Sequence, residues 1–121
     1  MAWRVREADG GGRKAVVELE GMVDSTNLEE FFALINSVFK RGVNRIVLDL
    51  ENTSYLSSGG LSVIIDAYNR AAREGGKLVI ARVSEMVLDI FRAVHFDQIV
   101  EFHASLEEAL DSVGGREETP D

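Results

Sequence analysis

The sequence contains no cysteine, so disulfide bonds and thiolate-bound metal ions are excluded. It has no run of eighteen apolar residues, the length that a membrane-spanning helix needs. The first twelve residues, MAWRVREADGGG, lack the apolar core of a secretory signal. We therefore expect a cytoplasmic protein that is not inserted into a membrane.

Basic residues are scarce as well. Lys and Arg total 13 against 21 Asp and Glu, which gives a formal net charge of −8. Nucleic acid phosphates are met by basic surfaces, so this balance argues against a nucleic acid partner. The two histidines, His95 and His103, lie eight residues apart in different predicted elements, without the spacing typical of a metal site. We expect neither a metal ion nor a cofactor.

The composition of the chain suits one domain. Its 121 residues are 45% hydrophobic, enough for one core and too few for two. We assign residues 1–113 to this domain. The last residues, 114–121 (GGREETPD), are polar and include the only proline, so we expect them to form a disordered C-terminal tail.

The apolar residues recur with the periods of strands and helices. Alternation on both sides of residues 9–13 predicts two short strands joined by a glycine-rich turn. A helical repeat then begins near residue 28, with Asp24 or Ser25 as its cap and Gly42 after its end. Its apolar positions should face the core: Leu28, Phe31, Phe32, Ile35, Val38 and Phe39.

Further strands and helices alternate along the rest of the chain. Strands are predicted at residues 46–50, 77–81 and 99–102. Helices are predicted after the serine pair at 57–58 and after the cap candidates Ser84 and Ser105. The pattern predicts an α/β fold, a single domain with a mixed sheet of about five strands and about four packed helices.

The stretch IVLDLENTSYLSSGGL, residues 46–61, is the most informative part of the chain. An apolar strand is followed by the polar residues 51–54, which we interpret as a turn. Ser57 and Ser58 precede a helical repeat, where a hydroxyl oxygen can accept a hydrogen bond from a free backbone amide. Two glycines follow, so we expect an exposed hydroxyl at the positive end of a helix dipole, where an anionic group is tolerated.

Catalytic interpretations of these motifs are weaker. The glycines at 10–12 lead into a strand pattern and lack the GxxxxGK[ST] spacing of a phosphate-binding loop. A hydrolase nucleophile elbow requires GxSxG, whereas Leu56 and Ser57 precede Ser58. Among the carboxylates, only Asp24 and Asp49 are predicted at strand ends close to a helix start. We do not expect an enzyme.

Three separated motifs resemble a known family. GMVD at 21–24, the central stretch at 46–61 and GGKLVIA at 75–81 resemble the STAS domain, and more narrowly the bacterial anti-sigma-factor antagonists. The resemblance extends from about Val5 to Val113. It implies a small α/β protein that is phosphorylated on one serine in a motif like DSSGL, at the start of the second main helix. Aligning the glycine and leucine of that motif places the phosphorylated serine at Ser58.

The resemblance also implies a binding surface and its partners. The surface would comprise Asp24, Ser57, Ser58, Gly59 and Gly60, with Ser57 as a secondary phosphorylation candidate. The partners would be an anti-sigma factor with serine kinase activity, from which binding releases the sigma factor, and a serine phosphatase that resets the site. Exposed apolar residues such as Val63 and Met86 are further candidates for the partner face.

Two alternatives to this interpretation remain open. The chain has Ser57 where the family usually has aspartate, and Gly59 where a second hydroxyl residue follows. STAS domains also serve as regulatory subunits of transporters or lipid-trafficking complexes, where no serine chemistry is required. From spacing alone, Ser58 can also be an ordinary helix cap.

Overall fold

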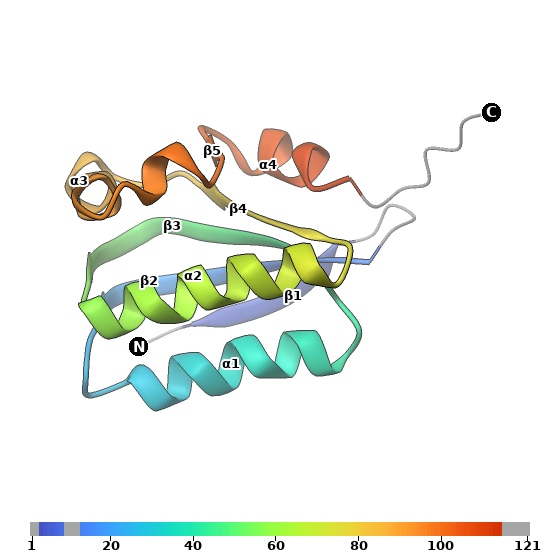
Figure 1. Ribbon diagram of the computed structural model, residues 1–121, viewed down its shortest axis with the longest axis horizontal. Helices are drawn as coiled ribbons and strands as arrows, with labels where there is room; N and C mark the ends of the chain where they lie inside the picture. The colour runs from blue at the N-terminus through green and yellow to red at the C-terminus, as the bar shows by residue number, and fades with distance from the viewer. Residues whose placement is uncertain (1–2, 9–12, 115–121) are drawn as a thin grey trace.

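The computed structural model describes residues 3–8 and 13–114, which form one mixed five-stranded sheet with four α-helices (Figure 1). The strands lie in the order β1-β2-β3-β4-β5; β1 is antiparallel to β2, and all other neighbours are parallel. This confirms the predicted α/β fold. The elements are β1 (Arg4–Ala8), β2 (Lys14–Val23), α1 (Leu28–Lys40), β3 (Arg45–Leu56), α2 (Ser58–Arg73), β4 (Lys77–Ala81), α3 (Glu85–Ala93), the 3-10 turn η1 (Phe96–Gln98), β5 (Phe102–His103) and α4 (Leu106–Ser112).

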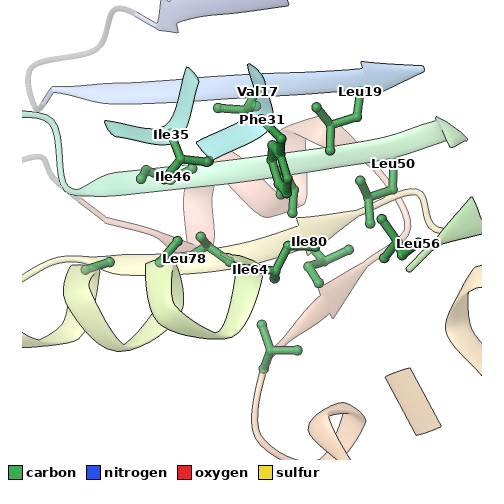
Figure 2. Close-up of a cluster of buried hydrophobic side chains, with 14 of the residues drawn as sticks. Val17, Leu19, Phe31, Ile35, Ile46, Leu50, Leu56, Ile64, Leu78 and Ile80 are labelled. Carbon is green, nitrogen blue, oxygen red and sulfur yellow. The ribbon is translucent and has the colours of Figure 1, made fainter. Parts of the chain in front are cut away.

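One face of the sheet packs against α1, α2 and α3 and carries the main hydrophobic core. Side chains alternate between the two faces along a strand, so every second residue of β2, β3 and β4 points into this core. Figure 2 shows Val17, Ile46 and Leu78 of the strands gathered with Phe31 of α1 and Ile64 of α2. This packing fixes the positions of α1 and α2, which run side by side across the sheet (Figure 1).

The opposite face of the sheet is covered in part by α4. The intervening strand residues Val16, Val47 and Val79 form a second, smaller cluster with Ala109 and Val113. Each of these side chains is at most 1% exposed. Because β3 and β4 are covered on both faces here, their sequences are continuously apolar rather than alternating.

Three basic side chains tie the end of α4 to the sheet. Lys14 Nζ donates to the carbonyl of Leu110 at 2.9 Å, and Lys77 Nζ donates to the carbonyl of Ser112 at 3.3 Å. Arg45 donates to the carbonyl of Val113 at 2.8 Å. Carbonyls in the last turn of a helix lack partners within the helix, and cations are favourable at that end of its dipole. These contacts therefore support a helix of only seven residues.

Strand β3 is longer than the sequence pattern predicts. Residues 51–54, interpreted as a turn, continue the strand and pair with the second half of β2. Thr53 is 3% exposed and its hydroxyl donates to the carbonyl of Leu19 at 3.0 Å, so a polar residue is accommodated inside the sheet. Asp49 consequently lies in the middle of β3 rather than at a strand end, which corrects that prediction.

The predicted cap of the first helix is also wrong. Helix α1 begins at Leu28, and the capping position is Asn27, whose side chain makes no capping hydrogen bond. Neither Asp24 nor Ser25 occupies this position. Phe32, predicted to face the core, is 55% exposed. Gly42 follows the end of the helix as predicted, with a φ of +80°.

The remaining boundaries follow the sequence with one exception. The hydroxyls of Ser84 and Ser105 cap α3 and α4 as predicted, accepting from the amides of Val87 and Glu108. The last strand comprises Phe102–His103 instead of residues 99–102, and a 3-10 turn at residues 96–98 precedes it.

Two predictions fall on residues outside the described ranges, the glycine-rich turn at 9–12 and the tail at 115–121. Within the described ranges, no helix has the length and apolar character needed to cross a membrane.

Candidate functional site

The two serines at the start of α2 have different roles in the structure. Ser57 has an extended backbone, and its hydroxyl oxygen accepts a hydrogen bond from the amide of Gly60 at 3.2 Å. Its carbonyl accepts from the amide of Leu61 at 2.9 Å. Ser57 is therefore the helix cap, which confirms the prediction that the serine pair caps this helix and identifies which serine does so.

Ser58 is the first residue of α2 and its side chain is exposed. Its hydroxyl forms no hydrogen bond with any of the described residues. The first turn of α2 contains no acidic residue, so no carboxylate of the helix itself offsets the positive end of its dipole. An added anionic group at Ser58 would meet a favourable local field.

The two glycines allow α2 to start close to its neighbours. A Cβ on Gly60 would lie 3.0 Å from Cγ1 of Val23, the last residue of β2. A Cβ on Gly59 would lie 2.7 Å from Cδ2 of Leu28, the first residue of α1. The amide of Ser57 also donates to the carbonyl of Val23 at 2.8 Å. The turn that contains Ser57 and Ser58 is thus held against the end of β2.

Asp24 follows directly on Val23 in a tightly hydrogen-bonded loop. Its Oδ1 accepts from the amide of Thr26 at 3.0 Å and from the hydroxyl of Thr26 at 2.6 Å. Asn27 connects both sides of the loop: its Oδ1 accepts from the amide of Asp24, and its Nδ2 donates to the carbonyl of Met22, each at 2.9 Å. The site therefore includes a carboxylate with a fixed position.

The hydrogen bonds donated by the Thr26 hydroxyl, and then by its amide, lower the pKa of Asp24. The carboxylate is consequently ionised at neutral pH. Sequence reasoning identified Asp24 but not Thr26 or Asn27. The signal was present, since aspartate two residues before threonine is typical of a turn in which the carboxylate accepts from the backbone.

Two exposed apolar side chains flank this loop and were not predicted. Met22 and Tyr55 pair in register between β2 and β3 and are 47% and 44% exposed. They lie two residues before Asp24 and two before Ser57, respectively. The candidate site thus combines a small neutral turn, one carboxylate and an apolar border.

The histidines lie elsewhere. His95 follows α3 with a left-handed backbone, and His103 lies in β5 with Nε2 3.1 Å from Oε1 of Glu101. Among the described residues, no group of three or more His, Cys, Asp or Glu side chains is placed to hold a metal ion.

Residues 3–109 match the STAS domain family. The chain belongs to this family. BtrV of Bordetella bronchiseptica, described as a candidate anti-sigma factor antagonist, is 32% identical over 78 residues, which cover 64% of this chain and 67% of that protein.

Several solved structures share the fold. An anti-sigma factor antagonist candidate of Thermotoga maritima superposes with a TM-score of 0.82 at 20% identity, covering 92% of this chain and 93% of that one. The Bacillus protein SpoIIAA superposes in its unphosphorylated form at 0.77 and in its phosphorylated form at 0.72, each at 21% identity and 93% coverage of this chain, with 96% and 99% of SpoIIAA covered. This chain therefore shares its fold with solved structures of anti-sigma factor antagonists.

Proposed function

We propose that this STAS domain is an anti-sigma-factor antagonist of the cytoplasm that acts by binding and not by catalysis. It binds an anti-sigma factor with serine kinase activity and so releases the sigma factor. Phosphorylation of Ser58 by that kinase ends the interaction, and a serine phosphatase restores it. The binding surface comprises Asp24, Ser57, Ser58, Gly59 and Gly60.

One observation carries the proposal: Ser57 caps the helix, which leaves the neighbouring Ser58 hydroxyl exposed and without a hydrogen bond to any described residue. A kinase can therefore modify Ser58 without breaking the cap. The relatives described as anti-sigma factor antagonists, and the fold shared with both forms of SpoIIAA, support this assignment.

The physical basis of the switch is electrostatic. A phosphate adds about −1.5 to −2 charges at neutral pH, and the start of α2 tolerates them within the domain. A partner that covers this surface must remove water from the phosphate, and the ionised Asp24 in the same surface adds like charge. The fold should survive modification, whereas the interface should not.

The test combines a phosphorylation assay with a binding assay. A purified anti-sigma factor of the serine-kinase class, taken from the gene neighbourhood of this chain, is incubated with the protein and ATP, and the phosphate is mapped by mass spectrometry. We expect phosphate on Ser58, normal but ATP-insensitive binding of Ser58→Ala, and roughly 10–100-fold weaker binding of Ser58→Asp, since each 1.4 kcal/mol is about tenfold.

Ser57→Ala serves as the matched control because it removes a neighbouring hydroxyl that the proposal assigns to the helix cap. It should still be phosphorylated on Ser58. Absence of phosphate from both serines, together with undiminished binding of Ser58→Asp, would reject the proposal. Binding of a transporter or lipid-trafficking subunit under those conditions would favour the other use of STAS domains.

A further inference from the structure

A shallow apolar groove lies between α1 and α2, with a volume of about 60 Å³. Its lining includes the exposed Phe32 and the half-buried Val63, together with the buried Ile35 and Ala67. Phe32 is 55% exposed although it is a large aromatic side chain. A hollow of this size accommodates about one aliphatic side chain from a partner.

The groove begins about one helical turn away from the surface proposed to bind the kinase. Gly59 packs against Leu28, so the first turns of α1 and α2 meet beside Ser58. Val63 lies four residues after Gly59, and Phe32 lies four residues after Leu28. Side chains four positions apart share a helix face, so Val63 and Phe32 lie one turn further along the same two faces. Figure 1 shows both helices beginning at the same end of the sheet. A partner seated over Ser58 therefore reaches the groove directly.

The far end of the groove is closed by Arg70. Its guanidinium lies 4.3 Å from the centre of the Phe39 ring and donates to Oδ1 of Asn36 at 3.1 Å. It also donates to Oε2 of Glu74 at 3.0 Å. The contacts with Phe39 and Asn36 bridge α1 and α2, so the groove is present before any partner binds and need not be formed on binding.

The charges beside the groove indicate the chemistry of its occupant. Glu29 lies one turn before Phe32 on α1, and Asp66 lines the groove from α2; both are exposed. Neither carboxylate takes part in an ion pair with the residues that the structure describes. The chain as a whole carries a net charge of −8. A complementary partner segment presents an aliphatic side chain with Lys or Arg beside it.

We propose that the groove receives a helix of the anti-sigma kinase, which inserts one aliphatic side chain between Phe32 and Val63 and places a basic residue beside Asp66. Amphipathic helices commonly bind grooves of this kind through a few apolar anchors. This inference rests on the proposed function and adds a second contact to it. The groove holds the partner by apolar burial, while Ser58 alone responds to phosphorylation.

The experiment measures the dissociation constant of the purified kinase-class anti-sigma factor by titration calorimetry, using four variants of the full chain. Phe32→Ala should weaken binding at least about tenfold, the usual effect of removing an interface anchor. Asp66→Lys should weaken it several-fold and reduce its salt dependence, because a basic residue would then meet a basic residue. Thermal unfolding of both variants should match that of the unmodified chain, since neither side chain is buried.

Ile99→Ala is the matched control. Ile99 is 59% exposed, close to the exposure of Phe32, but it follows η1 outside the groove. It should change the dissociation constant less than twofold. Ser58→Asp is the fourth variant and reports whether the proposed function holds.

The outcomes separate the two proposals. If Ser58→Asp weakens binding while Phe32→Ala and Asp66→Lys do not, the groove inference is overturned and the proposed function stands. If the unmodified chain does not bind the anti-sigma factor, the proposed function fails and the inference fails with it. If the chain elutes as a dimer that Phe32→Ala dissociates, a second copy occupies the groove and the inference is overturned.

Discussion

The guanidinium of Arg82 holds the carboxylate of Asp49 through two hydrogen bonds, at 3.3 Å to Oδ1 and 2.7 Å to Oδ2. The Asp49 side chain is 5% exposed in the middle of β3, and Arg82 directly follows β4. Arg82 adopts a φ of +60°, a conformation uncommon outside glycine. The pKa of Arg82 is raised further above its usual value, and the hydrogen bond with Asp49 is the largest cause. The pair connects the centre of the sheet to the loop before α3.

Replacing Arg82 should destabilise the fold strongly. Arg82→Met leaves the Asp49 carboxylate buried without its partner, and we expect a loss of about 3 kcal/mol in the free energy of unfolding. This is the lower end of the range for buried pairs, because the Arg82 side chain is 31% exposed and solvent screens it. Urea denaturation measures the change.

The control for that prediction is Arg92, which forms ion pairs with Glu85 and Asp89 on the surface of α3. Arg92→Met should lower the free energy of unfolding far less than Arg82→Met does, because solvent screens exposed ion pairs. Equal losses in Arg82→Met and Arg92→Met would show that burial of Asp49 is not decisive.

Because Ser57 caps α2 and Ser58 does not, replacing the two serines should have different effects on stability. Ser57→Ala removes the hydroxyl that accepts from the amide of Gly60, and we expect a loss of about 1 kcal/mol. Ser58→Ala removes an exposed hydroxyl and should change the free energy of unfolding by less than about 0.5 kcal/mol. Chemical denaturation of both variants gives the comparison, and a reversed order would contradict the assignment of the cap.

The two glycines after α2 should differ in their tolerance of alanine. A Cβ on Gly76 would lie 1.9 Å from the backbone oxygen of Asn44, so Gly76→Ala forces the backbone apart and should cost about 3 kcal/mol or more. A Cβ on Gly75 meets nothing within 4 Å, and its φ of +85° makes Gly75→Ala cost about 1 kcal/mol. Thermal unfolding distinguishes them, and similar losses would refute the packing argument.

The loop around Asp24 predicts a pH dependence. Because its pKa is lowered in the folded protein, Asp24 stabilises the fold at pH values above the ordinary pKa of a carboxyl group. This stabilisation is lost as the pH falls through the pKa that Asp24 has in the folded protein. Thr26→Val removes the hydroxyl that is the largest cause of this lowering and should raise the pKa of Asp24. Carbon NMR of the carboxyl group follows the titration, and an unchanged pKa would contradict the role of Thr26.

The stability of Thr26→Val should show the same dependence. The free energy of unfolding of Thr26→Val should differ from that of the unmodified chain at neutral pH. The difference should disappear in acid, where Asp24 is protonated in both proteins. A difference that persists in acid would point to packing of the Thr26 side chain instead.

Much of the fold could be predicted from local signals. The serine caps of α2, α3 and α4, the glycines after helices and the apolar strand at 77–81 depend on neighbouring residues only, and these are confirmed. The extension of β3 through residues 51–54 could not be predicted in this way. It depends on pairing with β2, whose register shifts twice, between Glu18 and Glu20 and between Gly21 and Met22.

The candidate site was predictable in part. The motif resemblance selected Asp24 and Ser58, but only the pairing of Val23 with Leu56 brings these distant segments to the same end of the sheet. Sequence spacing did not show which of the two serines caps the helix. In the structure, only Ser57 has the extended backbone of a cap. Phe32 fits the helical core pattern, yet it lies at the groove beside α2.

The attachment of α4 determines where Gly114, the last described residue, lies on the sheet. Lys14, Arg45 and Lys77 are the first residues of their strands, so the end of α4 and Gly114 lie at the amino ends of the parallel strands. Ser58 lies past the other end of β3, a strand that is itself about 36 Å long at about 3.3 Å per step between residues. A label attached at residue 114 would therefore lie at the end of the sheet opposite Ser58, which makes this position suitable for immobilisation in kinetic measurements.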